Sequence, residues 1–374
     1  MKTFNAGRRV QETHYKSFRP APINRMWKLE NMELLQLLGQ ADREMGRLDM
    51  YSDYIPNIDL YIQMHVLKEA TQSSRIEGTQ TNMDDALLAK EDLAPAKRDD
   101  WEEVQNYVEA MNRAIALLET IPFSSRLIRE THKTLMQGVR GKDKLPGEFR
   151  RSQNWIGGAT INDAIFVPPA HSKIPELIAD LEAFVHNERE YFPELLKAAL
   201  VHYQFETIHP FLDGNGRVGR LMITLYLVSK GILKKPILYL SDFFERNRNH
   251  YYDNLSRVRE QNDLQQWFKF FLVGVIETAK SGIATFDNIL RLQKKLDRQI
   301  QTLGSRAANA HKVLHALYRR PVINAAEVGK IAKISPASAY KLVADLERLK
   351  VLREMTGGRR GRAYLFDSYV KFFR

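Results

Sequence analysis

Apolar residues recur at intervals of three and four along most of the chain, the spacing that places them on one face of an α-helix. Between residues 32 and 76 this spacing occurs twice, and Pro56-Asn57 separates the two runs. The second run predicts a helix from Ile58 to about Glu77, which ends before Gly78. The same pattern predicts helices over 101–119, 124–138, 173–186, 193–208, 216–230, 248–261 and 264–301. The chain is therefore predicted to be mainly α.

Patterns typical of β-strands are scarce before residue 350. The exception is Pro146 to Pro169, where short β-prone pieces flank Gly157-Gly158 and Asn162-Asp163. This arrangement predicts a hairpin. Residues 1–30 are rich in Pro and Arg, and the string Arg19-Pro20-Ala21-Pro22 favours an extended arm laid over the surface.

The last seventy residues form a distinct pattern after Gly304-Ser305, which we take as a domain boundary. Helices are predicted over 307–318, 325–332 and 336–349, followed by a hairpin around Gly357-Gly358. Asn324 and Glu327 are spaced as a capping box, and Ser335-Pro336 is typical of a helix start. This order of elements is typical of a winged helix-turn-helix domain.

The net charge of +11 is concentrated in this C-terminal segment. Residues 305–374 contain fifteen Lys and Arg against five Asp and Glu, an excess of ten positive charges. Such an excess on a small unit favours a polyanion, and we expect DNA to be the partner. The candidate DNA-binding residues are Lys341 in the third helix and Arg359, Arg360 and Arg362 in the wing. A protein-binding winged helix is the alternative.

Composition excludes several other classes of protein. The chain has no cysteine, so disulfides, thiolate zinc sites and cysteine nucleophiles are excluded. The N-terminus has no apolar core of a signal peptide, and the longest largely apolar run, residues 221–228, is too short to span a bilayer. We expect a cytoplasmic protein with no membrane partner.

One segment, His209-Pro-Phe-Leu-Asp213-Gly-Asn-Gly-Arg217-Val-Gly-Arg220, carries the candidate chemistry. It lies between two predicted helices and ends at a helix N-terminus, where free backbone N–H groups bind anions. Arg217 and Arg220 share one face of the first helical turn and can reach phosphate oxygens. Asp213 offers a carboxylate suited to Mg²⁺, and His209 is suited to act as a general base.

Other nucleotide-binding motifs fit this segment less well. The glycines at 214, 216 and 219 match the dinucleotide fingerprint, but that fingerprint must follow a buried strand and here it follows a helix. The Walker A pattern is absent. A lone histidine or a Gly-Asn-Gly turn is usually structural, so the prediction depends on the whole combination.

The complete string resembles the signature of the Fic family, His-x-Phe-x-(Asp/Glu)-Gly-Asn-Gly-Arg-x-x-Arg, and matches it at every defined position. The resemblance extends over nearly the whole chain. RPAPIN and KEATQSSRIEGTQ resemble the N-terminal region of the family, PGEFRRSQNWIGG with FVPP its flap, and NHYYDNL a helix downstream of the motif. The resemblance implies a helical Fic core with a small β-hairpin flap beside the active site.

The resemblance also implies a reaction. His209 would deprotonate a hydroxyl of a target protein, which would attack the α-phosphate of ATP, while Asp213 would hold Mg²⁺. Because Gly216 leaves room for phosphates, we prefer transfer of AMP to the phosphorylation carried out by relatives with a lysine in this loop. The implied ATP-binding residues are Glu77, Gly214, Asn215, Gly216, Arg217, Val218, Gly219, Arg220 and Tyr251. Tyr251 as an adenine contact has a core aromatic as its alternative.

The segment Ser73-Ser74-Arg75-Ile76-Glu77-Gly78 resembles the inhibitory motif of the same family. Ser73 and Glu77 lie on one helix face, and Gly78 suits the position that follows a helix. The resemblance implies that Glu77 pairs with Arg220 and keeps the γ-phosphate from binding productively. The alternative is a solvated glutamate on an amphipathic helix.

Two functions from different classes follow. The first is a protein adenylyltransferase acting on hydroxyls of other proteins or of itself, and the second is a DNA-binding regulator that uses a Fic core as a nucleotide sensor. His209 favours the first, because a sensor needs no base. We divide the chain into residues 1–100 with the arm and inhibitory helix, 101–303 as the catalytic core, and 304–374 as the winged helix. The target, the type of hydroxyl and the formation of a homodimer stay open.

Overall fold

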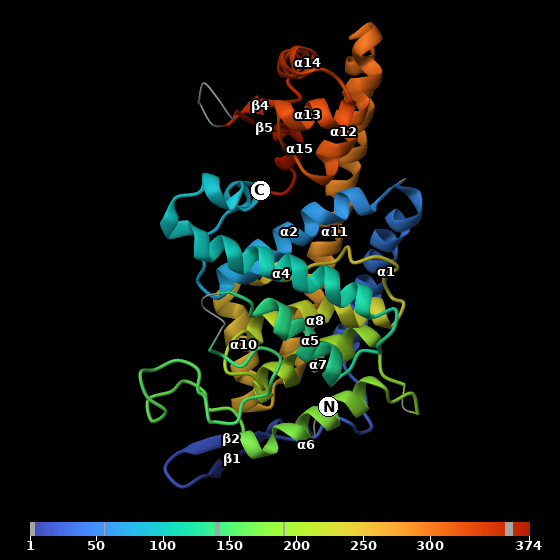
Figure 1. Ribbon diagram of the computed structural model, residues 1–374. Helices are drawn as coiled ribbons and strands as arrows, with labels where there is room; N and C mark the ends of the chain where they lie inside the picture. Colours follow the sequence, from blue (N-terminus) through green and yellow to red (C-terminus); the bar gives the residue numbers. More distant parts are fainter. Residues whose placement is uncertain (1–3, 56, 139–142, 190, 356–361) are drawn as a thin grey trace.

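The computed structural model describes residues 4–55, 57–138, 143–189, 191–355 and 362–374, and the structural statements below concern these residues. The chain is mainly helical, as predicted, and its few strands lie at the two ends of the molecule (Figure 1). Periodic apolar spacing located the long helices to within a few residues. They are α1 (Met32–Tyr54), α2 (Asp59–Ile76), α4 (Arg98–Leu117), α5 (Ser125–Leu135), α6 (Ile174–Val185), α7 (Glu194–Ile208), α8 (Asn215–Ser229), α10 (Arg248–Gln261) and α11 (Leu264–Gln301).

Short elements escaped prediction because they contain too few turns to show a period. They are α3 (Met83–Leu87), α9 (Ser241–Arg246) and the 3₁₀ turns Lys90–Asp92, Pro95–Lys97, His171–Lys173 and Gly304–Arg306. Asn82 begins α3 as an N-cap, since its side chain accepts a hydrogen bond from the Asp85 backbone N–H.

Helices α7 and α8 form the centre of the molecule (Figure 1). Residues 195–208 of α7 are all buried, including its polar side chains, and α8 is buried over nearly its whole length. A helix without a polar face must be surrounded by other helices. This pair is surrounded by α2, α4, α5, α6 and α11. The loop that carries the His209 to Arg220 motif therefore lies inside a rigid helical frame.

The N-terminal arm contains a pair of strands that the sequence did not predict. Residues 7–20 form an antiparallel pair, β1 (Gly7–Gln11) and β2 (Lys16–Pro20), with Gly7 opposite Pro20. These strands are rich in charged residues, and such a composition gives little strand signal in the sequence. The Phe18 N–H donates to the Val167 carbonyl at 2.9 Å, so this sheet is tied to the base of the flap.

The predicted hairpin in the flap is reduced to one antiparallel bridge between Ile156 and Phe166. Gly157 and Gly158 both have positive φ, at 69° and 76°, a conformation that glycine adopts without steric cost. The Asp163 carboxylate then accepts hydrogen bonds from the backbone N–H groups of Ala159 and Thr160. The flap is therefore an irregular loop held at its base.

The C-terminal segment has the three predicted helices, together with a strand and a short final helix that were not predicted. Its elements are α12 (Ala307–Arg319), β3 (Val322–Asn324), α13 (Ala325–Ala332), α14 (Pro336–Arg348), β4 (Arg353–Glu354), β5 (Ala363–Leu365) and α15 (Asp367–Val370), with strand order β3-β5-β4. The capping box of Asn324 and Glu327 and the N-cap of Ser335 are confirmed. Arg359, Arg360 and the predicted turn at Gly357-Gly358 lie outside the described residues. The winged-helix assignment remains our interpretation.

The C-terminal segment packs against α2, the helix that ends just before Glu77. The Tyr61 ring lies edge-on to that of Tyr318 at 5.2 Å, and Phe373 contacts His65 at 5.0 Å. Our three-part division of the chain remains an interpretation, because α2 packs on α4, α8 and α9 as well as on α12. Over the described ranges no helix is long and apolar enough to cross a bilayer.

Candidate active site

The motif loop is shaped by two residues with left-handed backbone and by one asparagine. His209 ends α7 with φ 50°, and Gly214 precedes α8 with φ 75°. Phe211 lies between these two residues. The Asn215 side chain accepts a hydrogen bond from the Phe211 N–H at 2.8 Å and donates one to the Phe211 carbonyl at 2.9 Å. Asn215 thus supplies hydrogen bonds to loop backbone groups that would otherwise be buried and unpaired.

His132 supports this loop from α5 and was not identified from the sequence. Its ring stacks on Phe211 with centroids 3.7 Å apart. The Gly147 N–H donates to Nδ1 at 2.9 Å, so Nε2 carries the proton and donates to the Asp213 carbonyl at 3.0 Å. Burial lowers the pKa of His132 to about 4, which agrees with this neutral tautomer.

His209 is half-buried, and its environment is electropositive. Burial lowers the pKa of His209 to about 4, and the nearby Arg150 and Arg259 add to the effect. Arg150 also donates to the His209 carbonyl at 2.9 Å and to the Pro169 carbonyl at 2.6 Å, which ties the flap to the motif. The imidazole is therefore neutral near pH 7 and can accept a proton.

Ser73, Glu77 and Arg220 meet as the resemblance implied. The Arg220 Nε–H donates to the Ser73 hydroxyl at 2.8 Å, and Nη2 donates to the Ser73 carbonyl at 2.9 Å and to Glu77 Oε1 at 2.6 Å. Burial opposes ionisation of Glu77, but Arg220 outweighs it and holds the pKa of this carboxyl below its ordinary value. The glutamate is therefore ionised and paired at neutral pH.

The Glu77 carboxylate also lies against the start of α8. A β-carbon at Gly216 would be 2.1 Å from Glu77 Oε1, so a larger residue here would displace the carboxylate. This is the helix N-terminus that the sequence suggested for an anion. In this structure a carboxylate of the chain itself lies at that position.

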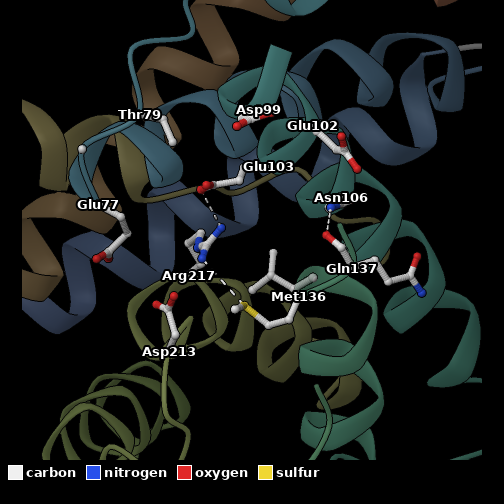
Figure 2. A pocket seen from close by; sticks show the side chains of 12 residues that line it. Glu77, Thr79, Asp99, Glu102, Glu103, Asn106, Met136, Gln137, Asp213 and Arg217 are labelled. Carbon is white, nitrogen blue, oxygen red and sulfur yellow. Dashed lines mark hydrogen bonds and ion pairs between the residues drawn. The ribbon is translucent and has the colours of Figure 1, made fainter. Parts of the chain in front are cut away.

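Arg217 faces a cavity of about 250 Å³ between α4, α5 and the motif (Figure 2). Its Nη1 pairs with Glu103 of α4 at 3.0 Å, and Asp213 and Glu77 line the same cavity. Where the structure describes the chain, no cluster of three His, Cys, Asp or Glu could hold a metal ion. A lone carboxylate such as Asp213 fits Mg²⁺ that arrives with phosphates, since Mg²⁺ needs only one or two protein ligands there.

Tyr251 does not have the exposure that a contact with adenine requires. It is 1 % exposed, its ring stacks on Phe244 at 4.5 Å, and its hydroxyl bonds to His202 at 2.9 Å. The alternative, a core aromatic, describes it. Tyr252 is 41 % exposed and is the tyrosine of this pair that a ligand can reach.

Glu206 explains a glycine of the motif and was also missed. A β-carbon at Gly219 would lie 2.2 Å from Glu206 Oε1, so a side chain here would displace the Glu206 carboxylate. Burial raises the pKa of Glu206 to about 7. Neither Glu103 nor Glu206 is distinguishable in the sequence from any other glutamate on a helix; only the contact with the motif identifies them.

Comparisons with known proteins match the region that contains this motif. The model described as Fic/DOC family N-terminal matches residues 35–116, and the model described as Fic/DOC family matches residues 122–227, which include the whole His209 to Arg220 motif. Among solved structures, a Fic family protein from Desulfovibrio desulfuricans has a TM-score of 0.56 at 18 % identity, covering 91 % of this chain and 98 % of that one. A Fic domain containing signaling protein from Bacteroides thetaiotaomicron has a TM-score of 0.53 at 20 % identity, covering 66 % and 95 %.

Two relatives carry names that state an activity. A protein adenylyltransferase Fic from Aedes aegypti is 33 % identical over 125 residues, which span 33 % of this chain and 22 % of that protein. A probable protein adenylyltransferase from Aquifex aeolicus is 29 % identical over 177 residues, covering 46 % and 50 %. The matched region is thus half or less of these relatives. With both Fic/DOC models matched in order along the chain and the motif folded into one site, this chain belongs to the Fic/DOC family.

Proposed function

We propose that this protein transfers AMP from ATP to hydroxyl side chains of proteins, itself included. The observation that carries the proposal is a neutral, half-buried His209 beside an anion-binding helix start that already attracts a carboxylate. The names of the relatives as adenylyltransferases support the same activity.

In the proposed reaction, His209 accepts the proton of a target hydroxyl as its oxygen bonds to the α-phosphorus of ATP. The bond from that phosphorus to the bridging oxygen breaks, and pyrophosphate leaves with the electron pair. Backbone N–H groups at 214–216 would receive the developing negative charge, and Arg217 and Arg220 would bind the β- and γ-phosphates. Asp213 would hold Mg²⁺, which when bound neutralises phosphate charge.

The position of the label on ATP tests this reaction. ATP labelled on the α-phosphate is expected to label protein, whereas ATP labelled on the γ-phosphate is not, because the γ-phosphate leaves in pyrophosphate. The measurement is incorporation into purified protein, alone and with lysate, by gel autoradiography. Labelling from the γ-position would instead indicate phosphoryl transfer and would refute the proposal.

We propose in addition that the C-terminal segment binds DNA. At the start of α14, Tyr340 is 64 % exposed, and Lys341 is exposed with no ion pair to any residue the structure describes. Arg362, in contrast, pairs with Glu354 at 3.4 Å. The exposed start of a third helix is the part of such domains that enters the major groove.

For the full chain we expect affinity for duplex DNA to fall steeply as salt rises, because bound lysines and arginines release condensed counterions. Lys341→Ala should weaken binding across sequences and reduce the salt slope by about one. Arg359→Ala with Arg360→Ala should weaken it further. Fluorescence anisotropy from 50 to 300 mM salt measures the affinity for DNA and its salt dependence for each variant. Absence of binding at low salt would favour a protein partner instead.

A further inference from the structure

We propose that Glu103 is a positioning residue that holds Arg217 with one edge of its guanidinium free to receive a phosphate of the nucleotide. The inference rests on the proposed function, because it concerns the same phosphate site. It adds a residue from outside the motif, on α4, to the machinery that binds the nucleotide.

The contact between the two side chains uses only one corner of the arginine (Figure 2). Arg217 Nη1 pairs with Glu103 Oε2 at 3.0 Å, and the two side chains are 7 % and 18 % exposed. The Nε–H of Arg217 is buried and has no hydrogen-bond partner within the described part of the chain. The Nη2 of Arg217 donates to the Met136 sulfur at 3.7 Å, which is a weak contact because a thioether is a poor acceptor.

The geometry of the guanidinium group shows which of its N–H groups remain available to a ligand. The Nε–H and one Nη2–H point the same way and form a fork that matches two oxygens of a phosphate. In Arg217 Glu103 binds Nη1, outside this fork. A buried fork without a strong acceptor is costly to maintain, so its persistence favours a ligand that supplies the missing oxygens.

Arg220 shows the opposite arrangement. Its Nε is used by the Ser73 hydroxyl, and its Nη2 by the Ser73 carbonyl and Glu77. The same fork is therefore occupied in Arg220 and open in Arg217. Two glutamates pair with the two motif arginines, yet Glu77 competes with a ligand and Glu103 does not.

Fixing Arg217 in advance favours binding for an entropic reason. A free arginine loses rotamer freedom when it binds a phosphate, and this loss reduces affinity. An ion pair at Nη1, held from a helix, removes that loss before the nucleotide arrives. Without Glu103, Arg217 could also turn toward other carboxylates of the cavity, such as Asp213.

The test compares ADP and AMP binding to the full-length protein in Mg²⁺ by isothermal titration calorimetry. Glu103→Ala is expected to weaken ADP binding by about ten-fold, the order of one charge-assisted contact, and to leave AMP binding within about two-fold. Glu103→Gln keeps an acceptor for Nη1 and should recover part of the loss. Arg217→Ala should lose at least as much, and the double variant should lose no more than Arg217→Ala alone.

Glu102→Ala is the matched control. Glu102 is the neighbour of Glu103, lines the same cavity and pairs with Lys90 at 2.7 Å. The Glu102→Ala substitution removes one negative charge from the cavity, as Glu103→Ala does, but leaves the contact with Arg217 intact. The affinity for ADP should therefore stay equal or rise slightly. Equal losses in the Glu102 and Glu103 variants would overturn the inference.

Tighter ADP binding in Glu103→Ala would also overturn it, because Glu103 would then be a second competitor like Glu77. So would unchanged ADP binding, or a wild type that does not bind ADP at millimolar concentration. This measurement does not involve transfer of label. If the protein fails to transfer AMP but Glu103→Ala still weakens ADP binding and spares AMP binding, the proposed function is refuted and the role of Glu103 stands.

Discussion

Replacing His209 by alanine is expected to reduce transfer of AMP by about 10² to 10⁴-fold, the range typical of general-base catalysis. ATP binding should stay within about two-fold, because the phosphates are held by other groups. Because His209 has φ 50°, the alanine variant could also disturb the loop. His209→Asn is the matched variant, since asparagine tolerates this conformation but cannot act as a base. The measurements are initial rates of α-label incorporation and ATP affinity by calorimetry. Undiminished transfer in both variants would refute the mechanism.

The pH profile of the wild type gives an independent check. With the pKa of His209 lowered to about 4, the free enzyme holds the neutral base at pH 6 to 8. The acidic limb of kcat/KM should therefore lie well below the ordinary pKa of histidine, and transfer should be lost only as pH falls toward 4. A fall centred near pH 6.5 would indicate a solvent-exposed histidine and contradict the buried environment.

Replacing Glu77 by glycine is expected to raise the initial rate of AMP transfer, including self-modification, by roughly ten-fold or more. The carboxylate now pairs with Arg220 and covers Gly216, so its removal frees both the arginine fork and the helix start. Release of about 1.4 kcal/mol of ground-state pairing accounts for a factor of ten. The measurement is initial incorporation of α-label at saturating ATP and Mg²⁺.

Two further variants and one separate measurement distinguish release of Arg220 from other effects. Arg220→Ala should not mimic Glu77→Gly, because the γ-phosphate would lose its anchor together with the inhibitor. Glu77→Gln keeps the shape without the charge and should give an intermediate rate. Loss of label from modified protein must be followed separately, since Glu77 could also support removal of AMP. Equal initial rates for wild type and Glu77→Gly would show that the pairing with Arg220 does not restrain transfer.

Much of the site was predictable because its groups are close together in sequence. His209, Asp213 and the two arginines lie within twelve residues, so two helix ends and one loop suffice to bring them together. Ser73 lies in the last turn of α2 and Glu77 is the C-cap of the same helix, so the two are one turn apart. Their meeting with Arg220 came from the resemblance to a family, because no local rule links residues 147 positions apart.

The sequence by itself determined the long helices, the turn chemistry of the motif and the concentration of charge near the C-terminus, because each depends on neighbours within one or two turns. Tertiary structure alone decided which residues from other helices reach the motif. It buried Tyr251 in an aromatic core, set His132 beneath the loop and brought Glu103 of α4 to Arg217. It also paired the charged N-terminal strands and left the flap irregular. These outcomes depend on packing between segments that are distant in sequence. The pattern of one segment does not indicate which other segments it will contact.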